Sequence, residues 1–111
     1  MLDSIMATAY RVVLVSVPRG GKAESLAEGI VEARLASCVN ILPDAVSIYR
    51  WKGRVRRDAE SLLVIKTTVS KLKALERWVK ARHPYEVPEF VALPVSSGSK
   101  EYLSWLAGQV R

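Results

Sequence analysis

Apolar positions divide the first part of the chain into a strand, a helix and a second strand. Residues 10–17 are rich in valine and end at a proline-arginine-glycine-glycine sequence, which predicts a buried strand. In residues 22–35 the apolar side chains recur at helical spacing with glutamates opposite, the pattern of an amphipathic helix. β-Branched and apolar residues return over 38–49, so we expect a second strand there.

The second predicted strand begins a long antiparallel hairpin. Because proline cannot donate a ladder hydrogen bond, we expect a kink or bulge at Pro43 and Asp44. Residues 51–54 supply the reversal, and Val55 followed by residues 61–68 makes the returning strand.

The last part of the chain predicts two more helices and one more strand. Ser70 is the candidate N-cap of a helix that ends where His83 precedes a proline. Residues 89–95 form a fourth strand, and Ser99 caps a short C-terminal helix.

The resulting order, βαββαβ with a C-terminal helix, predicts an α+β fold of the ferredoxin-like type. Right-handed crossovers place both helices on one face of its four-stranded antiparallel sheet. Residues 12–15 and 62–65 are apolar at consecutive positions, so the other face is hydrophobic as well. No predicted element is long enough to cover that face, and we therefore expect other copies of the chain to cover it.

Length and composition fit one domain of a cytoplasmic protein. Half of the 111 residues are hydrophobic and a quarter are charged. We expect residues 1–9 to be a flexible extension and residues 10–111 to be the domain. Cys38 is the single cysteine and residues 1–9 lack a signal-peptide pattern, which favours the reducing cytoplasm. No apolar run approaches the length of a membrane span, so no membrane insertion is expected.

The net charge of +6 raises the question of a nucleic-acid partner. The basic residues form two clusters, Arg54, Arg56 and Arg57 in one and Lys73, Arg77 and Lys80 in the other. Acidic residues Asp58, Glu60 and Glu76 interrupt both clusters, which is typical of a solvated surface. Residues 62–65, where an RNA-binding sheet would display stacking aromatic rings, are aliphatic. We therefore expect no nucleic-acid partner.

Cys38 and His83 are the only residues of their types, so a four-ligand zinc site of cysteine and histidine within one chain is excluded by count. Copper could still take a thiolate and an imidazole from different subunits, with Glu86 and Asp44 as oxygen donors. The alternatives are a small buried side chain for Cys38 and a helix-ending cap for His83.

Further candidate residues lie in one loop and on two strands. Residues 83–88 present the phenol of Tyr85 and the carboxylate of Glu86 between two prolines, either as a site or as a rigid connection. Lys66, in an apolar strand, is an edge charge or a buried, paired cation. Tyr49 shares a strand face with Trp51, and the two rings fit packing better than a role as stacking platforms. No set of nucleophile, base and acid and no phosphate-binding glycine loop occurs, so no enzymatic activity and no organic cofactor are expected.

Six short segments, in order over nearly the whole chain, carry a family resemblance. They are ASCVN at 36–40, YRWKG at 49–53, LVIKTT at 63–68, HPY at 83–85, PE at 88–89 and YLSWL at 102–106. Together they resemble the CutA family of divalent-cation tolerance proteins.

The resemblance implies a ferredoxin-like homotrimer, similar to the PII signalling proteins, that takes part in divalent metal tolerance and binds Cu(II) or another divalent cation. It implies His83 and Cys38 as candidate copper ligands, although Ser16 and Arg82 stand where some bacterial relatives carry a cysteine and a histidine. It also implies a cleft between subunits. The residues matching that cleft are Tyr49, Lys66, Tyr85 and Glu86.

Two functions follow as hypotheses. The first is a non-enzymatic cytoplasmic trimer that handles divalent metal ions, copper above all. The second is a PII-like signalling or scaffold trimer whose cleft binds a small anion or a partner protein.

Overall fold

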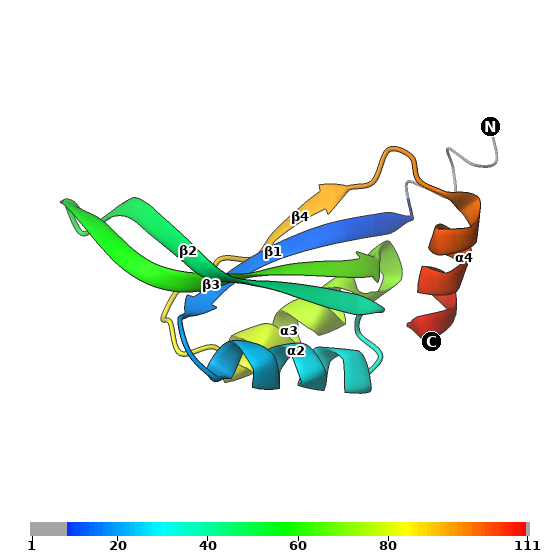
Figure 1. Ribbon diagram of the computed structural model, residues 1–111, viewed down its shortest axis with the longest axis horizontal. Helices are drawn as coiled ribbons and strands as arrows, with labels where there is room; N and C mark the ends of the chain where they lie inside the picture. The colour runs from blue at the N-terminus through cyan, green and yellow to red at the C-terminus, as the bar shows by residue number, and fades with distance from the viewer. Residues whose placement is uncertain (1–8, 111) are drawn as a thin grey trace.

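Four antiparallel strands form one sheet in the order β2-β3-β1-β4 (Figure 1). The computed structural model describes residues 9–110. In the middle of the sheet, β1 (Tyr10–Pro18) pairs with β3 (Arg54–Thr68) on one side and with β4 (Val91–Pro94) on the other. The opposite edge of the sheet is β2 (Cys38–Trp51), which pairs with β3.

Two helices cover one face of this sheet. Figure 1 shows α2 (Lys22–Glu32) and α3 (Leu72–Arg82) side by side beneath the strands, and α4 (Lys100–Gln109) at one end of the sheet. The predicted α+β fold, with its βαββαβ order, long hairpin and C-terminal helix, is confirmed. The predicted N-terminal extension lies outside the described residues except for Ala9.

The main core lies between the sheet and the two helices. Alternate residues of β1 and β3 face it, because successive side chains of a strand point to opposite faces. Fully buried members of the core are Val13, Val15, Val17, Ile30, Leu63, Ile65, Leu75 and Val79. Burying one such side chain stabilises the fold by about 1.5–3 kcal/mol. A smaller cluster beneath α4 contains Tyr10, Leu103 and Leu106.

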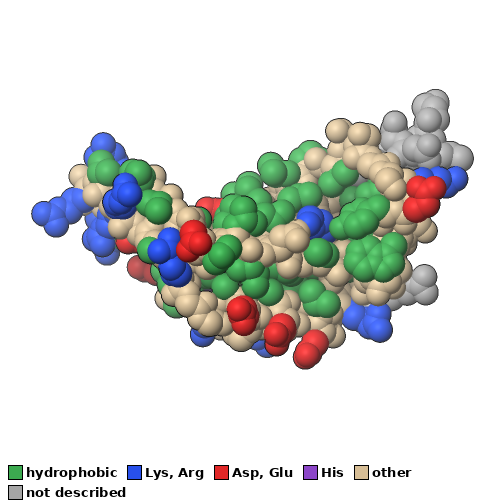
Figure 2. Space-filling model, viewed as in Figure 1, with side chains coloured by type: hydrophobic (Ala, Val, Ile, Leu, Met, Phe, Trp, Pro, Cys, Tyr) green, Lys and Arg blue, Asp and Glu red, His purple; other side chains and the backbone are tan. Residues whose placement is uncertain are grey.

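The other face of the sheet is also apolar, as the consecutive hydrophobic positions predicted. Val12 lies beside Leu93, and Leu14 lies between Val64 and Val91. Leu93 and Val91 are 45% and 47% exposed. Figure 2 shows hydrophobic side chains gathered over the strands and the terminal helix. Within the part of the chain that the structure describes, no element crosses this face (Figure 1).

The β2–β3 hairpin extends well beyond the helices (Figure 1). Its turn residues Lys52 and Gly53 have φ angles of 51° and 78°, which match the two positive φ angles of a type I′ turn. A register shift separates Leu42 from Ala45, so the irregularity predicted at Pro43 is confirmed.

Two local predictions are wrong. Ser70 does not cap α3, because a 3₁₀ turn (Val69–Lys71) precedes the helix and the Ser70 hydroxyl lies 3.0 Å from that of Thr68. The fourth strand is shorter than predicted, because it pairs with only residues 11–14 of β1. The predicted cap at Ser99 is confirmed, since its hydroxyl accepts a hydrogen bond from the backbone N–H of Tyr102 at 3.2 Å.

Candidate functional site

A cavity of about 810 Å³ lies between the hairpin and the loop that follows α3. The hairpin lines it with Tyr49, Asp58 and Glu60, and the loop lines it with Tyr85 and Glu86. Ser47 and Asp58 pair across the hairpin, as do Tyr49 and Arg56, so these side chains share one face of the ribbon. Three of the four residues predicted to line a cleft, Tyr49, Tyr85 and Glu86, therefore come together.

His83 fixes the loop against the sheet. The helix α3 ends at Arg82 because the residue before Pro84 is extended, with ψ at 139°. The His83 ring is buried, and its Nε2 lies 2.7 Å from the carbonyl oxygen of Ser16. Its Nδ1 accepts a hydrogen bond from the backbone N–H of Tyr85 at 3.1 Å. A carbonyl only accepts and an amide only donates, so the ring is the neutral tautomer with its proton on Nε2.

Tyr85 pairs with a buried carboxylate. Its hydroxyl donates to Oε2 of Glu60 at 2.6 Å, and Glu60 is only 4% exposed. Burial raises the pKa of the Tyr85 phenol well above its ordinary value, and the hydrogen bond to Glu60 raises it further. Tyr85 therefore stays a hydrogen-bond donor across the physiological pH range.

A second tyrosine repeats this arrangement on the hairpin. The hydroxyl of Tyr49 donates to Oδ2 of Asp58. This hydrogen bond is the main reason that the pKa of Tyr49 is raised. Two of the carboxylates in the cavity, those of Asp58 and Glu60, thus each accept a hydrogen bond from a tyrosine hydroxyl.

The cavity is acidic although the chain as a whole is basic. Four carboxylates line it, those of Asp58, Glu60, Glu86 and Glu89, against the single guanidinium of Arg56. None of the four forms an ion pair with another described residue. The sequence pattern does not identify Asp58 and Glu60 as cavity residues, because an acidic residue in a charged hairpin has the pattern of a solvated surface.

Lys66 and Cys38 lie elsewhere on the sheet. They are paired with each other across β2 and β3, and the Lys66 ammonium donates to Oδ1 of Asn40. Lys66 is six residues from Glu60 along β3, a distance of about 20 Å in a strand. One copy of the chain therefore does not bring Lys66 into the cavity with Tyr49, Tyr85 and Glu86.

The two candidate metal ligands are also apart within one copy. Cys38 pairs with Lys66, and the carbonyl that His83 contacts belongs to Ser16, which pairs with Leu62. These positions are about 13 Å apart along β3. Among residues 9–110, no three His, Cys, Asp or Glu residues are grouped closely enough to hold a metal ion. A metal would reach a ring nitrogen of His83 only by replacing one of its two hydrogen bonds.

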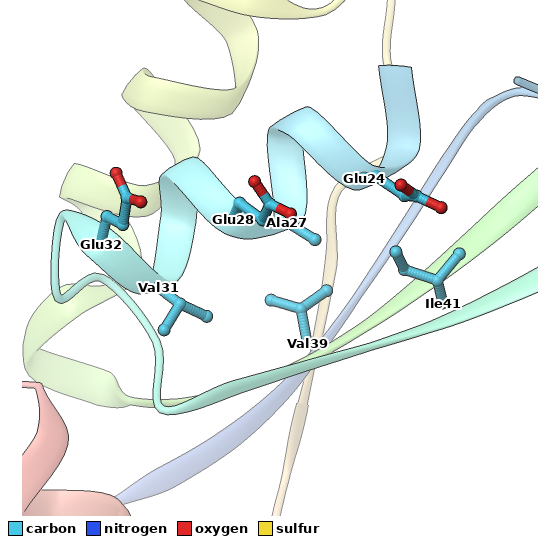
Figure 3. A pocket seen from close by; sticks show the side chains of 7 residues that line it. All are labelled: Glu24, Ala27, Glu28, Val31, Glu32, Val39 and Ile41. Carbon is cyan, nitrogen blue, oxygen red and sulfur yellow. The ribbon is translucent and has the colours of Figure 1, made fainter. Parts of the chain in front are cut away.

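A second depression of about 490 Å³ lies between α2 and the edge strand β2 (Figure 3). Val39 and Ile41 rise from the strand toward the helix, which presents Glu24, Glu28 and Glu32 along the rim (Figure 3). Figure 2 shows acidic side chains in a row over α2. The three glutamates follow the helical spacing that identified them in the sequence as the polar face of the helix.

None of the described helices combines the length and the hydrophobicity that crossing a membrane requires.

Comparison with known proteins gives consistent matches over almost the whole chain. Residues 11–109 match the family model described as CutA1 divalent ion tolerance protein. A divalent-cation tolerance protein CutA of Thermus thermophilus is 54% identical over 95 residues, covering 86% of this chain and 92% of that protein. The chloroplastic CutA of Arabidopsis thaliana is 48% identical over 100 residues, which are 90% of this chain and 55% of the longer plant protein.

Solved structures agree with this result. The CutA1 crystal structure from Oryza sativa has a TM-score of 0.91 at 46% identity, covering 96% of this chain and 97% of that chain. The Cut A1 structure from Thermus thermophilus has a TM-score of 0.89 at 50% identity, covering 92% of this chain and 99% of that chain.

Proposed function

Because this chain belongs to the CutA1 divalent ion tolerance protein family, we propose that it supports divalent-cation tolerance as a homotrimer. In this proposal the trimer is cytoplasmic, binds copper or another divalent cation and catalyses no reaction. The observation that carries the proposal is the apolar face of the sheet opposite the helices, which no described element crosses.

Two features of the fold support assembly from several copies. Val12, Leu14 and Val64 lie on the apolar face and are only partly buried in one copy, so another copy gains hydrophobic contact there. The β2–β3 hairpin extends beyond its own helices, which suits a head-to-tail contact with the next copy (Figure 1). Head-to-tail contacts remain finite only when they close into a ring, and three copies form such a ring.

Sedimentation equilibrium of the purified chain at micromolar concentration tests the assembly. We expect three times the mass of one chain, and a stable monomer would overturn the proposal.

Metal binding in this proposal depends on the trimer. Cys38 from one copy and His83 from another would give copper the thiolate and imidazole that it favours. This requires His83 to release a hydrogen bond, and the Nδ1 bond to the Tyr85 N–H is a neutral one worth about 0.5–1.5 kcal/mol.

Titration calorimetry with Cu(II) tests the two ligands separately. We expect His83→Ala and Cys38→Ser each to weaken copper binding, and Ser37→Ala, next to Cys38, to leave it unchanged. Unchanged copper affinity in both ligand variants would remove the metal site from the proposal.

A second function is favoured by the cavity between the hairpin and the loop after α3. Its volume of about 810 Å³ suits a small molecule, and the hydrogen bond between buried Glu60 and partly buried Tyr85 gives it fixed polar groups. The protein would then act as a PII-like signalling or scaffold trimer. A thermal-shift screen of metal ions and metabolites separates the two functions, because a ligand stabilises the state to which it binds. Stabilisation by a metabolite and not by copper would support the second function.

A further inference from the structure

The depression between α2 and β2 lies along a free edge of the sheet. In the strand order β2-β3-β1-β4, β2 pairs with β3 on one side and with no described strand on the other. Residues 38–42 keep a regular register with β3, because the shift comes only after Leu42. The unpaired backbone groups of such an edge are ready to pair with a further strand.

The depression gives an added strand an apolar floor beside this edge. Val39 and Ile41 are half-buried and point from β2 toward the helix, and Ala27 and Val31 of α2 line the same space (Figure 3). Val31 is 41% exposed. When an extended peptide adds to a sheet edge, main-chain hydrogen bonds give the affinity and every second side chain enters a pocket that gives specificity. The apolar depression is such a pocket.

The rim of the depression determines the charge of the strand that fits. Glu24, Glu28 and Glu32 follow one another four positions apart on α2, which is about 6 Å along the helix axis. Every second residue of a strand points to the same face, at a spacing of about 6.6–6.8 Å. Three basic side chains at alternate positions therefore match the three glutamates. None of these glutamates forms an ion pair or hydrogen bond with another described residue.

Lysine and arginine suit both parts of the depression. Their aliphatic stems can pack on Val39 and Ile41 while their charged ends reach the glutamates. A strand with carboxylates at the same positions would be repelled by the rim. The depression is on the helix side of the sheet, so it is separate from the apolar face on which the assembly proposal rests (Figure 3).

We propose that β2 accepts an extended segment of a partner protein as an additional strand of the sheet, with lysine or arginine at every second position facing α2. The proposal goes beyond the two functions above. It needs neither copper nor the cavity between the hairpin and the loop after α3.

The test is titration calorimetry of the full chain with a peptide of seven residues, blocked at both ends, in which threonine and lysine alternate. The control peptide has the same composition and charge but carries its three lysines consecutively, so a strand cannot place all three on one face. We expect the alternating peptide to bind about two- to fivefold more tightly, the worth of one exposed ion pair. Equal affinity of the two peptides would overturn the proposal.

Amide hydrogen exchange tests the addition of a strand directly. The outward-facing amides of residues 38–42 should exchange more slowly in the presence of the alternating peptide, because the added strand accepts their hydrogen bonds. Unchanged exchange over this segment at a saturating peptide concentration would also overturn the proposal, since the peptide would then be held by charge alone.

A charge reversal locates the site. Glu28→Lys should weaken binding of the alternating peptide about tenfold, because an ion pair is lost and a repulsion of similar size replaces it. Glu101→Lys is the matched control, since Glu101 is an exposed glutamate on α4 and the change in net charge is the same. Equal affinity of the two variants would contradict the proposal.

Sedimentation equilibrium of Glu28→Lys excludes the remaining occupant, another copy of the chain. We expect the mass of the unmodified protein. A lower mass in Glu28→Lys alone would mean that another copy fills the depression, and the partner segment would be rejected. A monomeric unmodified chain would instead reject the assembly proposal and leave this one standing.

Discussion

At the scale of single residues, the loop after α3 owes its position to His83. The ring joins three parts of the molecule, since it ends the helix, bonds to the carbonyl of Ser16 in β1 and receives the N–H of Tyr85. His83 and Tyr85 also lie ring to ring, with centroids 4.8 Å apart. The same imidazole that the sequence offers as a metal ligand is therefore a structural residue in one copy of the chain.

We predict that His83→Ala lowers the free energy of unfolding by about 1–3 kcal/mol, because one buried and one partly buried hydrogen bond are lost. Urea denaturation monitored by circular dichroism measures the change. Lys73→Ala is the control, since Lys73 is exposed on α3 and should change stability by less than about 0.5 kcal/mol. Equal stability of the two variants would show that His83 does not hold the loop.

Tyr85 gives a prediction about pH. Burial and the bond to Glu60 raise the pKa of Tyr85 in the folded protein above its unfolded value. The phenol therefore contributes stability that is complete below pH about 10, the ordinary tyrosine value, and is lost as the pH rises through the folded pKa.

Replacing Tyr85 by phenylalanine should lower stability by about 1–2 kcal/mol at pH 8, because Glu60 loses its donor. Urea denaturation between pH 8 and 11 should then show a smaller alkaline loss in Tyr85→Phe than in the unmodified chain. If both proteins lose the same amount of stability between pH 8 and 11, other tyrosines and lysines account for the whole pH dependence.

At the scale of the elements, backbone conformation determines which residues the hairpin turn accepts. Gly53 has a φ of 78°, and a Cβ added there meets no atom within 4 Å. Any cost of a side chain at this position is thus conformational and not steric crowding from neighbours. Gly21, before α2, has equally open surroundings but a φ of −65°, which every residue adopts.

We therefore predict that Gly53→Ala lowers the free energy of unfolding by about 1–2 kcal/mol, the cost of a left-handed residue with a Cβ. Gly21→Ala should leave it unchanged or raise it by about 0.4–1 kcal/mol, because the unfolded chain loses freedom. Thermal and urea unfolding of both variants measures the difference. Similar destabilisation by both substitutions would contradict this explanation.

The elements also show what periodicity predicts well. The apolar stripes at 10–17 and 62–65 predicted the central strands correctly, because short continuous apolar runs of β-branched residues are typical of strands. Ser70 failed as a helix cap because its hydroxyl bonds to Thr68 within a 3₁₀ turn, a local competition that spacing does not report.

The candidate site was predicted only in part. Tyr85 and Glu86 stood out because two prolines fix their loop, and the structure places them with Tyr49 in one cavity. Lys66 was grouped with them from the family pattern, which does not tell whether residues meet within one copy or between copies. Glu60 was missed because its burial depends on a loop more than twenty positions away in the sequence.

At the scale of the whole molecule, the decisive feature is the apolar face of the sheet. Leu93 lies on this face beside Val12, on the edge strand β4, and it is 45% exposed in one copy. Val69 is similarly exposed, at 47%, but it belongs to the 3₁₀ turn before α3. The role of the apolar face in assembly can therefore be tested by placing the same aspartate at two aliphatic positions of similar exposure.

We predict that Leu93→Asp dissociates the proposed trimer and that Val69→Asp does not. In each copy, assembly would bury the new carboxylate at position 93 without a partner. Each copy would also lose about 1.5–3 kcal/mol of hydrophobic burial. Sedimentation equilibrium at micromolar concentration gives the mass, and circular dichroism verifies that both variants remain folded. A Leu93→Asp trimer as stable as that of Val69→Asp would mean that copies meet elsewhere, and the apolar face would then need another partner. Dissociation by Leu93→Asp alone would establish that the consecutive apolar residues of the strands encode the assembly as well as the core.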